Sequence, residues 1–268
     1  MSPSTSGDLT GRVAVVTGAG RGLGRGAAVG LARRGATVIG VARTRSELQK
    51  TASLAVPGVV LPAIVDLADP DAATRFMDEV FDAHGHVDVL VNNAAMLRFA
   101  SFEDTPPDLW RSMMAINVEA VYRLTWVAYP RMVARRRGVI CNLSSGAGVR
   151  PFVAETAYAA TKYAIEGFTK SLALEALEHG VVVVLATPGV RCKPCSVTEA
   201  EFLAWPADKR AACADDLDVA EAFAWLGDQT DALLNGRRFD LHRLAQHVRD
   251  HGDGLAPYAA IQAADRPT

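Results

Sequence analysis

A tyrosine and a lysine stand four residues apart in the stretch YAATK, as Tyr158 and Lys162. In a helix, residues at this spacing share one face. A tyrosine with its ordinary pKa near 10 is a poor proton shuttle at neutral pH, but a positive charge about 4 Å away contributes on the order of 4 kcal/mol in partly screened surroundings. That is enough to lower the tyrosine pKa by roughly three units. The pair therefore indicates acid–base chemistry, although Y-x-x-x-K alone is usually an ordinary helix surface.

A second chemical signal is the glycine-rich stretch TGAGRGLG at residues 17–24, which follows an aliphatic run and opens a helical one. Backbone amides at a helix amino terminus bind anions, and glycines let a ligand approach the backbone closely. This context favours a pyrophosphate site over glycines that serve only strand–helix packing.

The elements that must position these residues alternate along the chain. Near-continuous Val, Ile and Leu runs are typical of strands covered by helices on both faces. The alternation predicts one α/β domain with a doubly wound parallel sheet, whose strands end at one edge where ligands bind. Strands are expected at 13–17, 37–41, 59–65, 87–91, 138–143 and 181–186, and helices near 22–34, 45–54, 70–84, 107–136 and 157–179.

The last quarter of the chain has a weaker pattern. Residues 190–216 lack a strand signal and predict a substrate loop with a short helix, 218–227 are expected to be helical, and 237–241 to form a last short strand. The predicted organisation is a disordered lead over 1–10, a dinucleotide-binding and catalytic domain over 11–241, and a C-terminal helix and tail over 242–268.

The composition excludes several classes of protein. A formal charge of −2 implies no broad basic surface for nucleic acid. No apolar run approaches the roughly 20 residues that span a bilayer, and the amino end does not read as a secretion signal. Four cysteines indicate no dense disulfide framework, so the cytoplasm is expected. The histidines at 242, 247 and 251 are expected on a solvated helix, and no metal site is predicted.

These motifs resemble the short-chain dehydrogenase/reductase family in its compact form. The spacing T-G-x-x-x-G-x-G, the sequence NNAA after the fourth predicted strand and Y-x-x-x-K all match, over about residues 11–189. The resemblance implies a single-domain Rossmann-like fold and oxidoreductase activity. Two departures are Ala95, where the family has glycine, and HRLAQHVRDHGDG, which replaces the family's glycine-rich ending.

The resemblance also implies catalytic roles. Tyr158 would protonate a carbonyl oxygen during reduction or deprotonate an alcohol during oxidation. Lys162 would lower the tyrosine pKa and bind the nicotinamide ribose. Ser145, whose spacing to Tyr158 matches the family better than that of Ser144, would donate a hydrogen bond to the substrate oxygen. Asn117 would hold a water that links Lys162 to solvent.

The residues at the second predicted strand's end favour NADP(H) over NAD(H). Ala42 stands where an acid would grip the ribose of NAD, while Arg43 and Arg21 suit a 2′-phosphate. The alternative is that both arginines are ordinary surface residues. Asp66 matches the family's adenine-binding aspartate. The expected cofactor contacts are Gly18, Arg21, Gly22, Leu23, Gly24, Arg43, Asp66, Leu67, Asn93, Ala94, Tyr158, Lys162, Pro188, Gly189 and Lys193.

The run VRCKPCS holds Cys192 and Cys195 in a C-x-x-C spacing just after a P-G pair that matches the family. A redox pair normally opens a helix, and zinc would need two more ligands, so both roles are disfavoured. The family usually places a threonine where Lys193 stands. We expect Lys193, with Arg191, to contact a cofactor phosphate or an acidic substrate group.

The predicted function is NADP(H)-dependent reduction of a ketone to a secondary alcohol, or the reverse, on a bulky apolar or aromatic small molecule such as a secondary-metabolite intermediate. The alternative is a reductase-fold protein that binds NADP(H) without net redox turnover, in an isomerase or dehydratase step or as a cofactor sensor. The resemblance further implies a homodimer or homotetramer through helices near 107–136 and 157–179. The expected pocket lining, for which core filling is the alternative, is Met96, Leu97, Phe99, Phe152, Val153, Phe202, Leu203 and Trp205.

Overall fold

Seven parallel strands form one sheet in the order β3-β2-β1-β4-β5-β6-β7. The computed structural model describes residues 8–190 and 192–251, so most of the predicted lead, Arg191 and the tail over 252–268 lie outside the described residues. The strand order reverses between β1 and β4, the kind of switch point at which open α/β sheets bind ligands. The strands are β1 (Val13–Thr17), β2 (Thr37–Ala42), β3 (Val59–Ile64), β4 (Val89–Asn92), β5 (Gly138–Leu143), β6 (Val181–Thr187) and β7 (Arg238–Asp240).

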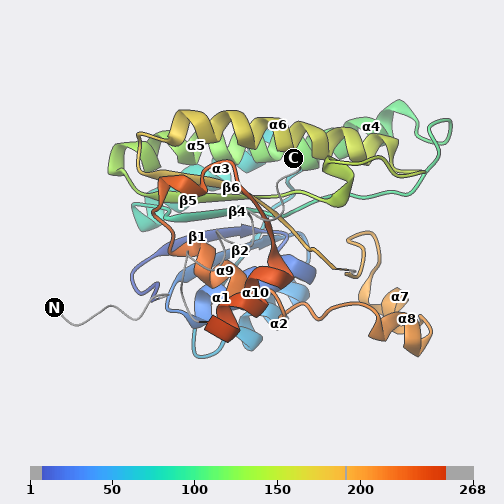
Figure 1. The fold of residues 1–268 in the computed structure, drawn as a ribbon, viewed down its shortest axis with the longest axis horizontal. Helices are drawn as coiled ribbons and strands as arrows, with labels where there is room; N and C mark the ends of the chain where they lie inside the picture. Colours follow the sequence, from blue (N-terminus) through green and yellow to red (C-terminus); the bar gives the residue numbers. More distant parts are fainter. Residues whose placement is uncertain (1–7, 191, 252–268) are drawn as a thin grey trace.

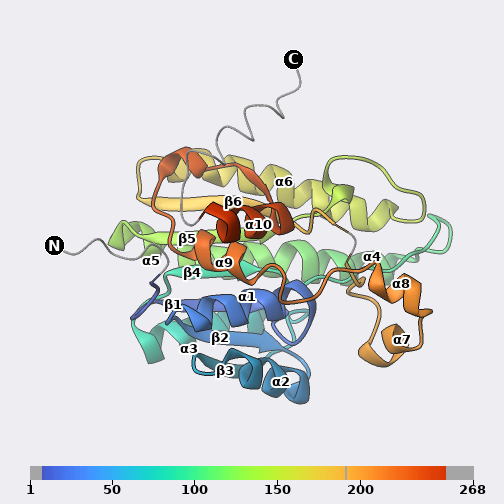
Figure 2. The same ribbon diagram turned by 60° about the horizontal axis from the view of Figure 1, so that its bottom comes forward.

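Helices cover both faces of this sheet, which confirms the predicted doubly wound fold (Figure 1). One layer consists of α1 (Gly22–Arg33), α2 (Arg45–Ala55), α9 (Ala220–Gly227) and α10 (Leu241–His251). The other consists of α3 (Pro70–His84), α4 (Pro107–Met114), α5 (Ala120–Arg135) and α6 (Thr156–Ala176). In Figures 1 and 2 the short helices α7 (Glu199–Leu203) and α8 (Ala207–Ala211) stand apart from both layers.

The central aliphatic runs, those of β1, β5 and β6, form strands whose side chains are buried on both faces. In β1, Ala14 and Val16 pack with the α1 layer, whereas Val13 and Val15 pack with the layer of α3 and α5. Burial of roughly 25 cal/mol per Å² of apolar surface on each face drives this arrangement. Continuous apolarity, rather than alternation, was therefore the correct signal for this sheet.

The helical stretch predicted near 107–136 is interrupted. A π-helical turn, η1 (Ala115–Glu119), joins α4 to α5. Such turns are rare and frequently lie at functional sites. Asn117 lies in this turn.

The C-terminal part contains the predicted last strand and more packing than the sequence suggested. β7 pairs with β6, and α10 follows it directly. Leu244, Ala245 and Val248 of α10 are buried in the same core as α1 and α9. The helix expected beyond residue 242 is thus α10, which packs one apolar face against this core. Within the described ranges no helix is long and apolar enough to cross a membrane.

Candidate active site

A cavity of about 820 Å³ lies where the strands end, and it brings together most residues predicted from the sequence. The glycine loop, the turns after β2 to β6 and the loop beyond β6 all contribute to its wall. Gly24, Asn117 and Gly189 are not among the lining residues. The predicted residues that line it are Gly18, Arg21, Gly22, Leu23, Arg43, Asp66, Leu67, Asn93, Ala94, Ser145, Tyr158, Lys162, Pro188 and Lys193.

The glycine loop is held tightly against the turn after β4. Asn93 donates through Nδ2 to the Thr17 carbonyl at 2.8 Å, and its backbone N–H donates to the Thr17 hydroxyl at 2.9 Å. A Cβ on Gly18 would come within 2.7 Å of Asn93 Nδ2, and one on Gly24 would overlap the Gly18 carbonyl. Gly18 also has φ +66, which a side chain would strain. Gly24 therefore lets the loop pack closely against the turn after β4, and the loop leads into the amino terminus of α1, where backbone amides favour an anion.

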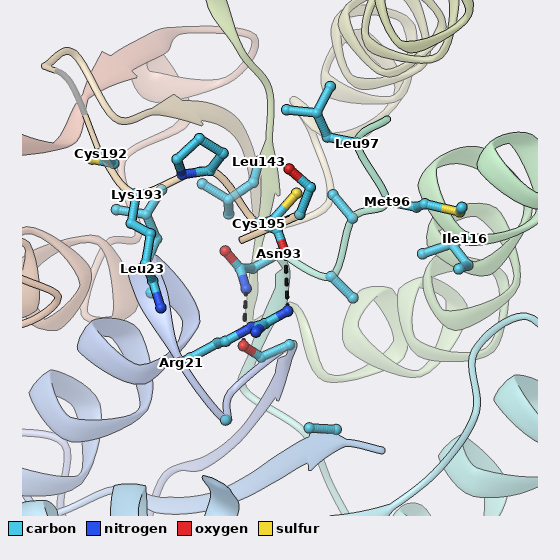
Figure 3. Close-up of a pocket in the computed structure, with 18 of the residues that line it drawn as sticks. Arg21, Leu23, Asn93, Met96, Leu97, Ile116, Leu143, Cys192, Lys193 and Cys195 are labelled. Carbon is cyan, nitrogen blue, oxygen red and sulfur yellow. Dashed lines mark hydrogen bonds between the residues drawn. The ribbon is translucent and has the colours of Figure 1, made fainter. Parts of the chain in front are cut away.

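Arg21 crosses the cavity from the glycine loop to the loop beyond β6 (Figure 3). Its Nη2 donates to the carbonyl oxygen of Cys195 at 2.9 Å, and its Nη1 lies 3.8 Å from Glu47 Oε1. Glu47, at the start of α2, also lines the cavity, a residue that sequence reasoning missed. Its position in the first turn of the helix that follows β2 is the signal that could have found it.

The turns after β2 and β3 form the other end of the cavity. Arg43 is exposed there beside Ala42, and no acid occupies the turn position of Ala42. Asp66 is exposed and accepts a hydrogen bond from the Ala68 N–H at 3.0 Å, whereas Leu67 is buried. This end offers a guanidinium, a carboxylate and an apolar surface to a ligand.

Tyr158 and Ser145 lie in one wall of the cavity, Tyr158 in α6 and Ser145 just after the end of β5. Tyr158 is 8% exposed. Burial raises the pKa of its hydroxyl, the Cys195 thiol raises it further, and a hydrogen bond with Ser145 lowers it. The sequence predicted a lowered pKa; that prediction is wrong for this arrangement, because desolvation of the phenolate outweighs the other effects.

Lys162 lies behind Tyr158. Its Nζ is 5.6 Å from the tyrosine ring centroid and donates to the Leu143 carbonyl at 2.7 Å. Burial lowers the pKa of Lys162 to about 8, and Cys195 and Glu166 oppose that shift. The lysine is thus protonated at neutral pH but easily titrated.

Ser144 and Ser145 point in different directions. Ser144 is buried and donates to Glu166 Oε1 at 2.6 Å. Ser145 caps the 3₁₀ turn that follows β5, where its hydroxyl accepts from the Ala147 N–H at 3.2 Å, and it lines the cavity together with Tyr158. These contacts support the choice of Ser145 over Ser144.

Asn117 is 1% exposed and bridges two parts of the wall. Its Oδ1 accepts from the Met96 N–H at 2.7 Å, and its Nδ2 donates to the Met96 carbonyl at 2.9 Å and to Thr161 Oγ1 at 3.0 Å. The side chain therefore fixes the turn after β4 to α6, the helix that carries Tyr158 and Lys162.

The loop beyond β6 closes over the cavity. Pro188, Cys192, Lys193 and Cys195 line it. Burial raises the pKa of Cys192 to about 11, and desolvation also raises that of Cys195. Raised thiol pKa values are the opposite of what redox-active cysteines need.

Asp216 is a second residue that sequence reasoning missed. Its Oδ2 accepts from the Gly22 N–H at 2.8 Å and from Arg25 Nη1 at 3.2 Å, so a carboxylate lies at the amino terminus of α1. A negative charge is favourable there. No local pattern marks Asp216, because its partners are far away in the sequence.

The expected pocket lining is mostly wrong. Met96 and Leu97 line the cavity, together with Ile116. Phe202 instead packs against Trp205, with ring centroids 5.5 Å apart. Residues that were expected in the lining and lie outside it are Phe99, Phe152, Val153, Phe202, Leu203 and Trp205.

Comparisons with known proteins agree with this geometry. A family model described as short chain dehydrogenase matches residues 12–198. Oxidoreductase UcpA of Escherichia coli (strain K12) is 35% identical over 272 residues, covering 95% of this chain and 99% of that protein. L-xylulose reductase of Mus musculus is 34% identical over 227 residues, covering 84% of this chain and 88% of that protein.

Solved structures lead to the same family. A metagenomic short-chain oxidoreductase in complex with NADP has a TM-score of 0.73 and 33% identity over 87% of this chain and 96% of its own. A putative NAD(P) dependent gluconate 5-dehydrogenase from Beutenbergia cavernae with bound NADP has a TM-score of 0.75 and 32% identity over the same shares. The chain therefore belongs to the short-chain dehydrogenase family.

Proposed function

We propose that the protein is an NADP(H)-dependent oxidoreductase that interconverts a ketone and a secondary alcohol. The observation that carries this proposal is that Ser145, Tyr158 and Lys162 line one wall of the same cavity that the glycine loop lines. Within this wall, Lys162 lies behind Tyr158. Two hydroxyl groups, those of Ser145 and Tyr158, with the Lys162 ammonium nearby are suited to proton transfer to or from a carbonyl oxygen.

The side chains around this wall have different tasks in this proposal. Tyr158 moves the proton, and Ser145 orients the substrate oxygen toward it. Lys162, protonated below a pH of about 8, stabilises the phenolate and binds the nicotinamide ribose. Asn117 holds α6 against the turn after β4 and connects Lys162 to solvent. The nicotinamide, when bound, supplies or accepts the hydride.

The cofactor preference is proposed as NADP(H). Arg43 is exposed at the cavity end, next to Ala42 rather than an acid, and can pair with a 2′-phosphate. Glu47 lies near Arg21 and competes for it, so the preference rests mainly on Arg43. The two similar structures described above contain NADP. The remaining proposed contacts are Gly18, Gly22, Leu23, Asp66, Leu67, Asn93, Ala94, Pro188, Gly189 and Lys193.

The substrate is proposed to be a small carbonyl or alcohol compound with an apolar portion. Met96, Leu97 and Ile116 form an apolar part of the cavity, and Figure 3 shows Met96 and Ile116 on the opposite side from Lys193. The Lys193 ammonium lies 5.7 Å from the Phe202 ring centroid. An anionic group on the cofactor or substrate is the proposed partner of Lys193.

The protein is proposed to form a homodimer or homotetramer through α5 and α6. Tyr122 and Trp126 lie four residues apart on α5 and are 51% and 62% exposed, and Leu174 of α6 is 72% exposed. Apolar side chains gathered on neighbouring helices mark an interaction surface. Trp126→Asp is expected to yield monomers in sedimentation, while a wild-type protein that is already monomeric would contradict the proposal. The four free cysteines suit the proposed cytoplasmic location.

Turnover with a panel of ketones tests the proposal. Purified protein should oxidise NADPH in the presence of at least one ketone, with a lower KM for NADPH than for NADH. Tight NADPH binding without turnover of any carbonyl or alcohol would instead favour an isomerase, a dehydratase or a cofactor sensor. Equal KM values for NADH and NADPH would contradict the proposed cofactor preference but not the proposed oxidoreductase activity.

A further inference from the structure

A buried carboxylate, Glu166, and a partly exposed guanidinium, Arg238, form hydrogen bonds with the two serines at the end of β5. Glu166 lies one helical turn after Lys162 in α6, and its side chain is 5% exposed. Its Oε1 accepts hydrogen bonds from Ser144 Oγ at 2.6 Å and from Arg238 Nε at 3.0 Å. Its Oε2 lies 3.2 Å from Lys170 Nζ. Glu166 is thus the centre of a polar cluster next to the catalytic wall.

Arg238 reaches this cluster from β7, on the far side of β6. Its Nε bonds to Glu166, and its Nη2 donates to the backbone carbonyl of Ser145 at 2.7 Å. The same carbonyl accepts the Gly148 N–H at 3.0 Å. One planar guanidinium therefore joins the Ser145 backbone to α6, a geometry that the single ammonium of lysine does not reproduce.

The turn after Ser145 has little room to shift. A Cβ on Gly148 would come within 2.7 Å of Ser144 Oγ and 3.1 Å of Glu166 Cγ. Held between Arg238 and this turn, Ser145 lies in the cavity wall that Tyr158 also lines. The close packing at Gly148 and the two hydrogen bonds that Arg238 donates thus determine where the Ser145 hydroxyl lies.

We propose that Arg238, paired with Glu166, is a positioning residue that fixes Ser145 against Tyr158. The effect of Arg238 on the turnover rate rests on the proposed oxidoreductase function. Arg238 lies beyond residue 198, where the family match ends. A displacement of about 1 Å at a reacting group can cost on the order of 10²-fold in rate, so a residue that does not touch the substrate can control kcat.

Arg238→Lys is the variant that tests this role. Lysine keeps the charge next to Glu166 but cannot bond to the carboxylate and the Ser145 carbonyl in the same way. We expect kcat to fall roughly 10- to 100-fold, with the KM for NADPH and the Tm close to wild type. Arg237→Lys is the matched control, because its Nε donates to the Leu233 carbonyl, away from the cavity, and its kcat should stay at the wild-type value.

The same change in a Ser145→Ala background separates positioning from a general structural effect. If Arg238 acts through Ser145, Arg238→Lys should change the residual kcat less than about twofold there. An equal loss of kcat in both backgrounds would overturn the proposal, as would a wild-type kcat for Arg238→Lys alone.

A crystal structure of Arg238→Lys provides a readout that needs no turnover. The Ser145 hydroxyl should be displaced from the Tyr158 hydroxyl, with α6 unchanged. Unchanged positions of both hydroxyls would overturn the proposal. If the wild-type protein turns over no carbonyl or alcohol, the proposed function fails, and this structural comparison still decides whether Arg238 positions Ser145.

Discussion

The catalytic wall (Ser145, Tyr158 and Lys162) and the substrate loop (the described residues from 192 to 216) face the same cavity but are built differently. The wall uses a buried strand and α6, a helix of 21 residues, and Lys162 is 3% exposed. The loop uses α7 and α8, helices of five residues each, and Leu203 is 58% exposed.

This difference in construction between the wall and the loop matches two different functions, proton transfer and ligand selection. Groups that move a proton must be held within a fraction of an ångström, and regular elements with buried hydrogen bonds achieve that. Groups that select a ligand can lie on a loop, where sequence changes cost little stability. Arg21 links the substrate loop to the glycine loop, because its guanidinium donates to the Cys195 carbonyl. Variants in each region should therefore affect different measurements.

The largest effect is expected from Tyr158→Phe in the wall. Loss of the hydroxyl removes the proton donor, so kcat should fall roughly 10²- to 10⁴-fold, while the KM for NADPH changes little. NADPH oxidation with a ketone substrate measures both. Tyr122→Phe, at an exposed position of α5, is the control and should keep the wild-type kcat. A Tyr158→Phe enzyme with wild-type kcat would remove Tyr158 from the mechanism.

Lys162→Met should make the protein more stable near pH 7 and less active. The pKa of Lys162 falls from 10.5 to about 8 on burial, which costs about 3 kcal/mol of stability while the lysine stays charged. Because the unfolded chain binds this proton more tightly, the cost is full below about pH 8 and disappears as the pH rises to 10.5.

Urea unfolding at several pH values measures this difference. The free energy of unfolding of Lys162→Met should exceed that of wild type most below pH 8, and the two should converge toward pH 10.5. Lys170→Met, an exposed position on the same helix, should show no such convergence. If the difference in the free energy of unfolding stays constant from pH 8 to 10.5, burial does not lower the pKa of Lys162.

Arg43→Glu should change cofactor use without touching the wall. Loss of one charge-assisted bond of roughly 1.5–3 kcal/mol raises the KM for NADPH by about 10- to 100-fold. The KM for NADH should fall or stay unchanged. Arg45→Glu, an exposed arginine outside the cavity, is the control. Equal losses of NADPH and NADH affinity would contradict a role in reading the 2′-phosphate.

Phe202→Ala in the substrate loop should have the smallest effect. Phe202 packs against Trp205 and the Lys193 ammonium, outside the cavity lining. Its loss should loosen the loop and raise the substrate KM about two- to fivefold, with kcat and Tm nearly unchanged. Leu203→Ala, an exposed neighbour, serves as the comparison. A large loss of Tm would mean that the loop is part of the folding core.

Much of the fold was predictable because its signals are local. Aliphatic runs located β1 and β5 at their observed bounds, since strands buried on both faces are apolar throughout. The spacing of Tyr158 and Lys162 and the glycine loop are local signals too, because each lies within a few consecutive residues. Missed features join residues that are far apart, such as Asp216 with Gly22.

The sequence by itself determined the layered sheet and the glycine loop, because periodicity and spacing carry that information, and its resemblance to a family suggested the residues that we propose as catalytic. Only the tertiary structure decided the environment of those residues. Burial raises the pKa of Tyr158 where spacing alone suggested the reverse. Contacts across the sheet bring Arg238 to the Ser145 carbonyl and leave Phe202 outside the cavity. Desolvation and long-range contacts depend on how the elements pack, and no local pattern records that packing.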